Sequence, residues 1–215
     1  MTPYTIMTEF WEASFQDKQT MWGFEPADSA VNTMELFYKN KIKEILLPGF
    51  GYGRNAQIFK DNGIEVTGIE ISNTAINLAK KHYGDSVKVH HGSVTDMPFD
   101  QTKYDGVFCY ALIHLLNTEE RKKLINDCFS HLHSGGLMVF IAISTNTPSF
   151  GTGTVISKNR YLTPHGVKLY YYDSMSVEEE FGHYGLEGAK EINEPAKNKG
   201  NKPSQVCWQI ICRKK

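Results

Sequence analysis

Short apolar runs alternate along the chain with segments in which apolar residues recur every three or four positions. The runs predict buried strands, and the segments between them predict amphipathic helices. Strands are expected at 45–47, 65–70, 87–90, 104–110, 137–144, 186–194 and 205–213. The last two have only a polar turn at 197–202 between them, so they must pair antiparallel. The pattern predicts an α/β fold: a seven-stranded, mostly parallel sheet with an antiparallel last strand and helices on both faces.

Polar residues mark where the helices should begin. Ser72 or Asn73 is expected to start a helix that reaches about residue 82, and Asn117 one that reaches about residue 132. Ser176, followed by Glu179 at the spacing of a capping box, should start another helix.

Two segments do not fit the simple alternation. Residues 145–168 are long and irregular for a connection, which indicates function or mobility, and we expect a substrate-side segment over 145–172. Of the three tyrosines at 170–172, at least one ring should point inward as core. Residues 1–40 carry many aromatic side chains and then a helix start near Asp28. They either pack as helices on a face of the sheet or form a lid over a ligand.

Composition bounds the class of protein. With 215 residues, of which 40% are apolar and 22% charged, a single domain over 1–215 is expected. The net charge of −1 predicts no nucleic-acid partner. No apolar run is long enough to cross a membrane, and the first residues lack the pattern of a signal peptide. The four cysteines have no metal-binding spacing, so we expect buried thiols in a reducing cytoplasm and no metal site. Monomer and homodimer both remain open.

A glycine-rich loop after the first strand carries the strongest functional signal. Gly49, Gly51 and Gly53 allow a sharp turn and the close approach of a ligand to the main chain. The following helix start offers unpaired N–H groups to a polar or anionic group. A dinucleotide-binding loop needs a small residue where this chain has Arg54, and a phosphate-binding P-loop needs a Lys followed by Ser or Thr. What remains is the pattern G-x-G-x-G.

The second strand ends in an acidic residue. Glu70 lies about 20 residues after the glycine loop, a position where a carboxylate can accept both hydroxyls of a ribose. The pairs at 93–94 and 109–110 also follow strands. Ligands bind beyond the carboxyl ends of parallel strands, so these residues are expected to converge on one cleft.

The pattern G-x-G-x-G resembles motif I of the class I S-adenosylmethionine-dependent methyltransferases, and the whole chain resembles their Rossmann-like fold. Within that superfamily it is most similar to the thiopurine and tellurite-resistance methyltransferases. The residues that carry this closer resemblance are the Trp-containing N-terminal segment, the Leu-Pro-Gly at 47–49 and the stretch at 68–72.

The resemblance implies S-adenosylmethionine as cofactor, with S-adenosylhomocysteine as product. It places Gly49, Phe50 and Gly51 at the methionine part, Glu70 at the ribose and the backbone of Cys109 at the amine. The full set of implied cofactor residues is Trp11, Trp22, Gly49, Phe50, Gly51, Gly53, Glu70, Ile71, Ser93, Val94, Cys109 and Tyr110. Ile71 and Val94 would sandwich the adenine, and the two tryptophans would help to close the site.

Three residues depart from the family pattern. Leu47 replaces an acidic residue that could pair with the amine, and Ser93 replaces an Asp that often contacts the adenine. Tyr110 stands where the thiopurine branch carries an Arg, so Arg54 is a candidate for the carboxylate.

The expected reaction is methyl transfer to a small soft or anionic nucleophile, such as an aromatic thiol or a chalcogen oxyanion. Such a nucleophile needs no base, whereas a hydroxyl or amine usually does. Tyr110 and His114 are catalytic candidates, although His114 could equally be a packing residue. The substrate candidates are His114, Arg160, Tyr161 and His165. A catalytically silent S-adenosylmethionine- or nucleoside-binding protein is the alternative.

Overall fold

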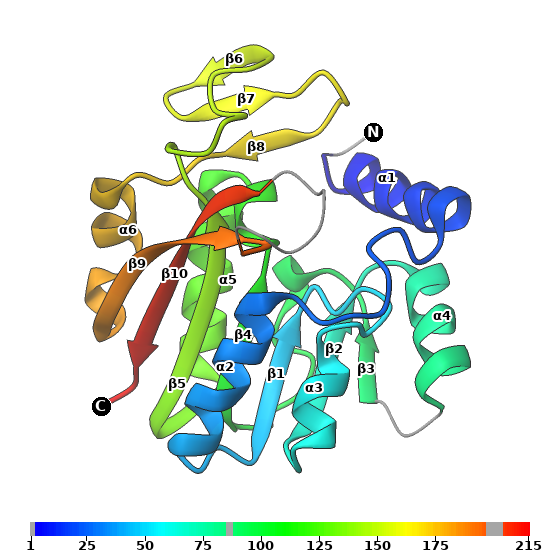
Figure 1. The fold of residues 1–215 in the computed structure, drawn as a ribbon, viewed down its shortest axis with the longest axis vertical. Coiled ribbons are helices and arrows are strands. Elements are labelled where there is room, and N and C mark those ends of the chain that lie inside the picture. The colour runs from blue at the N-terminus through cyan, green and yellow to red at the C-terminus, as the bar shows by residue number, and fades with distance from the viewer. Residues whose placement is uncertain (1–2, 85–87, 197–203) are drawn as a thin grey trace.

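A computed structural model describes residues 3–84, 88–196 and 204–215. Seven strands form one sheet in the order β3-β2-β1-β4-β5-β10-β9 (Figure 1). Their bounds are Glu44–Pro48 (β1), Glu65–Glu70 (β2), Lys88–His91 (β3), Tyr104–Tyr110 (β4), Leu132–Ile143 (β5), Leu186–Glu194 (β9) and Gln205–Arg213 (β10). β1 to β5 run parallel, and β10 lies antiparallel between β5 and β9. The predicted fold class is confirmed; the turn at 197–202 lies outside the described residues.

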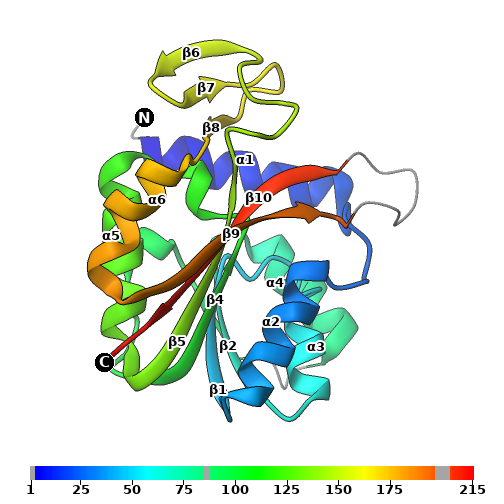
Figure 2. The same cartoon turned by 60° about the vertical axis from the view of Figure 1, so that its left-hand side comes forward.

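Helices cover both faces of this sheet (Figure 2). α2 (Asp28–Lys39), α3 (Ala56–Asp61) and α4 (Asn73–Tyr83) pack on one face, around a core that includes Phe37 and Phe59. α5 (Thr118–Ser130) and α6 (Ser174–Phe181) pack on the other, around a core that includes Leu124 and Phe181. Short 3₁₀ turns lie at Val94–Asp96 (η1), Ile113–Leu115 (η2) and Gly182–Tyr184 (η3). Among the described residues, no helix is both long and apolar enough to cross a bilayer.

Most helix starts follow the predicted polar residues. Ser72 caps α4 by accepting the Ala75 N–H, and Asn117 caps α5 in a capping box. The predicted cap of α6 was wrong: Asp173 is the N-cap, and its carboxylate accepts the Ser176 N–H at 2.8 Å. The Ser176 hydroxyl accepts the Asp173 N–H in return, so Ser176 occupies the third helical position of the box.

Residues 145–172 are more ordered than predicted. They contain a second, antiparallel sheet of β6 (Thr154–Ser157), β7 (Arg160–Leu162) and β8 (Lys168–Tyr170). This small sheet stands beyond the carboxyl ends of β1 and β4 (Figure 1). All four residues of β6 are exposed, so it lacks the alternation that reveals a half-buried strand. The predicted inward tyrosines are confirmed, because Tyr171 and Tyr172 are fully buried.

The first 40 residues form two helices that lie in different places. α2 is a packing helix on a face of the sheet. α1 (Pro3–Lys18) instead lies across the carboxyl-end side of the sheet, next to α4 (Figure 1). The Glu12 carboxylate joins the two helices, accepting the Ser72 hydroxyl at 2.6 Å and the Thr74 hydroxyl.

A buried ion pair joins the small sheet to the helices below it. The Arg121 guanidinium of α5 donates to the Glu180 carboxylate of α6 at 2.7 Å and to the Leu116 carbonyl at 3.2 Å. It also lies 3.8 Å from the ring centroid of Tyr170 in β8. A charge this deeply buried needs such partners, and together they fix the turn after β4.

We predict that Gly68→Ala destabilises the fold. A Cβ at Gly68, in the middle of β2, would lie 2.4 Å from the Phe50 ring. Displacing that ring should lower the free energy of unfolding by about 1–3 kcal/mol, measured by urea denaturation. Gly188→Ala on β9 is the control, because nothing lies within 4 Å of its Cβ position. Equal stability of the two variants would contradict this account of the Phe50 position.

Candidate functional site

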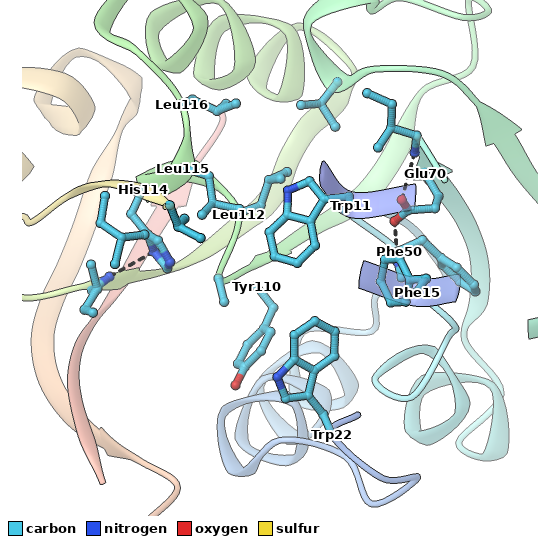
Figure 3. A pocket seen from close by; sticks show the side chains of 18 of the residues that line it. Trp11, Phe15, Trp22, Phe50, Glu70, Tyr110, Leu112, His114, Leu115 and Leu116 are labelled. Carbon is cyan, nitrogen blue, oxygen red and sulfur yellow. Dashed lines mark hydrogen bonds between the residues drawn. The ribbon is translucent and has the colours of Figure 1, made fainter. Parts of the chain in front are cut away.

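A cavity of about 840 Å³ lies at the carboxyl ends of the parallel strands. Its walls come from the glycine loop, the ends of β2 and β4, the aromatic N-terminal segment and the turn between β7 and β8. Figure 3 shows Glu70 and His114 on opposite sides of this space, with Trp11 and Tyr110 between them. The predicted convergence of strand-end residues on one cleft holds for the glycine loop, Glu70, Ser93, Val94 and Tyr110, which all line the cavity.

The glycine loop forms one wall. Gly49 and Gly51 have φ angles of 72° and 59° and line the cavity, so the main chain is open to a ligand there. The N–H groups of Gly49 and Phe50 both donate to the Ile69 carbonyl, which ties the loop to β2. Gly53 does not line the cavity; its φ of 84° shapes the loop beside the Phe50 ring.

Glu70 is held by the main chain. Its side chain accepts the Gly51 N–H at 2.7 Å through Oε2, and the N–H groups of Ile71 and Ser72 at 2.9 Å through Oε1. Oε2 accepts one of these three bonds and so has room for another donor, such as a hydroxyl. Burial raises the pKa of this carboxyl above its ordinary value of 4.5, and the three N–H donors oppose the rise.

The far end of this wall is apolar. Ile71 and Val94 line the cavity, as the resemblance implies for a flat ring. Ser93 lines it too, but its hydroxyl accepts the Thr95 N–H at 3.1 Å and pairs with the Thr95 hydroxyl. Ser93 therefore acts first as the cap of η1.

The end of β4 turns sharply into the cavity. Ala111 lines it with a φ of 52°, a left-handed conformation that is strained for alanine. The Cys109 side chain does not line the cavity; it is fully buried in the core on the α5 face. Burial raises the pKa of the Tyr110 phenol, and the Glu194 carboxylate adds to the rise. Tyr110 is therefore a neutral wall of the cavity at neutral pH and not a base.

His114 follows in η2 and lies at the opposite side from Glu70 (Figure 3). Its Nδ1 accepts the Ile143 N–H at 3.1 Å. Burial lowers the pKa of this imidazole from 6.5 to about 4, so the ring is neutral at physiological pH. The His114 side chain is buried and also lines the cavity.

Aromatic side chains close the cavity on the α1 side. Trp11, Phe15, Trp22 and Tyr52 all line it, and Trp22 stacks on Tyr52 with the ring planes 13° apart. The Tyr52 hydroxyl accepts the main-chain N–H of Trp22 and donates to the Gly23 carbonyl at 2.7 Å. The glycine loop thus holds the segment that covers it. Sequence reasoning missed Phe15 and Tyr52 as lining residues, although Tyr52 lies inside the G-x-G-x-G motif.

Arg54 also contacts Trp22. Its guanidinium donates to the Trp22 carbonyl at 3.0 Å and lies 5.9 Å from the Tyr110 ring centroid. It lines the cavity, and a guanidinium has five N–H donors, so Arg54 keeps donors that could also meet a carboxylate there.

The small sheet supplies the remaining wall. Its lining residues are Thr163, Pro164, His165, Val167 and Leu169. His165 lines the cavity as predicted, but Arg160 and Tyr161 do not. Tyr161 packs its ring against Phe150 and Tyr171, and Arg160 is half-buried near Arg121. Both belong to β7, whereas the cavity is lined by the β7–β8 turn and by Leu169 of β8.

The residues present fit a nucleoside with an extended polar tail. Exposed main chain at Gly49 and Gly51, an acceptor at Glu70 and apolar surfaces at Ile71 and Val94 follow one another along the wall. No group of three or more His, Cys, Asp or Glu side chains that could hold a metal ion occurs within the described part of the chain.

Residues 46–140 match the profile of a family described as "Methyltransferase domain". The "Ubiquinone biosynthesis O-methyltransferase" of Nitrosospira multiformis is 27% identical over 112 residues, which are 50% of this chain and 46% of that protein. The "O-methyltransferase resE" of Aspergillus sclerotiorum is 29% identical over 99 residues, 43% of this chain and 37% of that protein. The chain thus spans less than half the length of these curated relatives.

Two solved structures share the fold. The 1,6-didemethyltoxoflavin-N1-methyltransferase of Burkholderia thailandensis, bound to 1,6-didemethyltoxoflavin and S-adenosylhomocysteine, aligns with a TM-score of 0.72 and 14% identity, over 98% of this chain and 88% of that one. TehB of Haemophilus influenzae aligns with a TM-score of 0.66 and 16% identity, over 95% of this chain and 67% of that one.

The family match runs from β1 to β5 and so includes the glycine loop, Glu70 and His114. Together with the fit of the cavity walls, it supports S-adenosylmethionine as the cofactor. The chain has the Rossmann-like class I methyltransferase fold, and residues 46–140 at its centre are similar to the methyltransferase domain model.

Proposed function

We propose that the protein is an S-adenosylmethionine-dependent methyltransferase that acts on a small molecule. The observation that carries the proposal is the Glu70 carboxylate, which the Gly51 N–H holds at the edge of the cavity. Both residues lie in the segment that matches a methyltransferase domain model. The alternative, a catalytically silent S-adenosylmethionine- or nucleoside-binding protein, is not favoured, because the curated relatives that the chain matches carry the names of methyltransferases.

Each part of the wall has a role in this proposal. Gly49 and Gly51 would hold the methionine part of the cofactor, Glu70 the ribose, and Ile71 and Val94 the adenine. When bound, S-adenosylmethionine supplies an electrophilic methyl group on a sulfonium sulfur. The chain then orients the acceptor and excludes water from the site.

The acceptor would occupy the side of the cavity formed by His114 and the small sheet. That side is mainly apolar, with lining residues such as Leu115, Val167 and Leu169. The volume of the whole cavity, about 840 Å³, is in the range of small-molecule sites, so we propose a small acceptor and no nucleic-acid partner. An aromatic thiol or a chalcogen oxyanion, as in the thiopurine and tellurite branch, remains part of the proposal. The O-methyltransferase names of the curated relatives add hydroxyl acceptors to the classes to be tested.

A reducing, cytoplasmic setting completes the proposal. All four cysteines are unpaired and buried, and burial raises the pKa of the Cys207 and Cys212 thiols to about 12. Such thiols are inert and need no disulfide partner.

We also propose that α1 and the segment up to Phe24 form a lid. Trp11 and Trp22 border the cavity, yet Trp22 is 43% exposed. The Glu12 contact to Ser72 lies two residues from Glu70, so ligand binding and lid position share one corner of the site.

The protein should bind S-adenosylhomocysteine with a micromolar Kd, measured by calorimetry. This corresponds to a binding free energy of roughly −7 to −8 kcal/mol. Ribose hydroxyls donate to an ionised carboxylate, so affinity should fall as the pH is lowered through the pKa of Glu70. Because that pKa is raised, the fall should begin above pH 4.5. Glu70→Gln should weaken binding by about 1.5–3 kcal/mol at neutral pH and remove this part of the pH dependence.

Calorimetry with NAD is the control for the class of ligand. Binding of NAD with no heat from S-adenosylhomocysteine would overturn the proposed function. Unchanged affinity in a destabilised Glu70→Gln protein would show that the carboxylate has only a structural role.

Amides across residues 11–24 should exchange more slowly with solvent when S-adenosylhomocysteine is bound, because the lid then packs on the ligand. Glu12→Gln should weaken this protection, since it removes the charged acceptor for Ser72 and Thr74. Glu9→Gln is the matched control, because Glu9 is an exposed residue of the same helix. Equal protection with and without ligand would show that the segment is ordinary packing.

A further inference from the structure

The hydrogen bond to His114 fixes its tautomer. A neutral imidazole carries one proton and one lone pair on its two nitrogens. The Ile143 N–H donates to Nδ1, so the lone pair lies on Nδ1 and the proton on Nε2. If the ring were protonated to an imidazolium, Nδ1 would also carry a proton, and its N–H would face the N–H of Ile143. The same geometry that holds the ring therefore makes it a donor toward the cavity and leaves it no free lone pair to accept a proton.

His114 also lies beside the end of the site where methyl transfer would occur. Leu112, two residues earlier in the same turn, packs over Gly49: a Cβ there would lie 3.2 Å from its side chain. Gly49 belongs to the wall proposed for the methionine part of the cofactor. His114 lines the cavity across from Glu70, on the side that remains for the acceptor (Figure 3).

Most of the other titratable groups that line the cavity are engaged in hydrogen bonds within the fold. Glu70 is engaged by three main-chain N–H groups, and the Glu120 carboxylate accepts the Asn117 N–H at 2.7 Å in the cap of α5. The Tyr52 hydroxyl donates to the Gly23 carbonyl and the Tyr171 hydroxyl to the Ser149 carbonyl. Tyr110 is neutral, and Arg54 carries no lone pair that could accept a proton. His165 remains, on the exposed β7–β8 turn.

We propose that His114 donates its Nε2–H to the nucleophilic atom of the acceptor, and that this atom reacts as an anion such as a phenolate or an aromatic thiolate. The proposal rests on the proposed methyltransferase function and names the acceptor class for that site. An N–H donor binds an anion more strongly than the uncharged acid, so it favours the reactive form relative to the same site without the donor.

The step balances without a base on the protein. The anion uses one lone pair to form the bond to the methyl carbon, and the carbon–sulfur bond breaks with its electron pair passing to the sulfonium sulfur. The products are a methyl ether or thioether and neutral-sulfur S-adenosylhomocysteine. No proton moves, and the Nε2–H stays on His114.

The probe is 4-nitrophenol, titrated by absorbance against protein saturated with S-adenosylhomocysteine. Donation from Nε2 should lower the pKa of the bound phenol by roughly one unit or more relative to the same site without that donor. His114→Asn should abolish this shift, because the amide oxygen can replace Nδ1 as acceptor for Ile143 while no donor remains at the Nε2 position. His114→Gln, which places an N–H near that position, should restore part of the shift. His165→Ala should keep it.

Each result decides the question. A shift retained in His114→Asn, or lost in His165→Ala, would overturn the assignment, as would failure of the loaded protein to bind or ionise 4-nitrophenol. Affinity for S-adenosylhomocysteine, measured in the same samples, reports separately on the proposed function. Long-range ¹H–¹⁵N correlation spectra at neutral pH test the tautomer without any ligand. A proton on Nδ1 would contradict the proposal even if the cofactor binds.

Discussion

The hydrogen bond from the Gly51 N–H to the Glu70 carboxylate, at 2.7 Å, joins the ends of β1 and β2 and sets the site. Both strands end at the same edge because they run parallel, so a loop after one meets a side chain at the end of the other. Burial makes an unpartnered carboxylate costly, and three main-chain donors offset that cost. The position that suits a ribose is therefore built before any ligand arrives.

The end of β2 also contacts α1, the helix beside the site. Ser72 gives its N–H to Glu70 and its hydroxyl to Glu12, so the end of β2 holds both the Glu70 carboxylate and α1. Tyr52, inside the glycine loop, holds Trp22 in the same way from the other side. The lid that we propose is thus tied to the glycine loop and to the end of β2, which would suit a reaction that must exclude water.

Local sequence patterns predicted those features of the fold and the site that depend on residues close together in the sequence. The strands at 65–70, 104–110, 186–194 and 205–213 have the predicted bounds, because buried runs between polar turns are a local signal. Gly49, Glu70 and Tyr110 were placed correctly at one cavity because strand ends share one edge of the sheet.

Long-range contacts could not be read in this way. Phe15 and Tyr52 meet across 37 positions of chain, and no periodicity records that contact. The sequence did not predict the small sheet, because β6 is exposed throughout. For the same reason it did not predict that Arg160 and Tyr161 lie away from the cavity. The tautomer of His114 depends on the Ile143 N–H of another strand, so the sequence left its role open.

The most direct test of the central claim is a crystal structure of the protein with S-adenosylhomocysteine. We expect the ribose hydroxyls at Glu70, the adenine between Ile71 and Val94, and the sulfur beside the turn that leads to His114. A ligand bound elsewhere, or in this cavity with its ribose away from Glu70, would contradict the account.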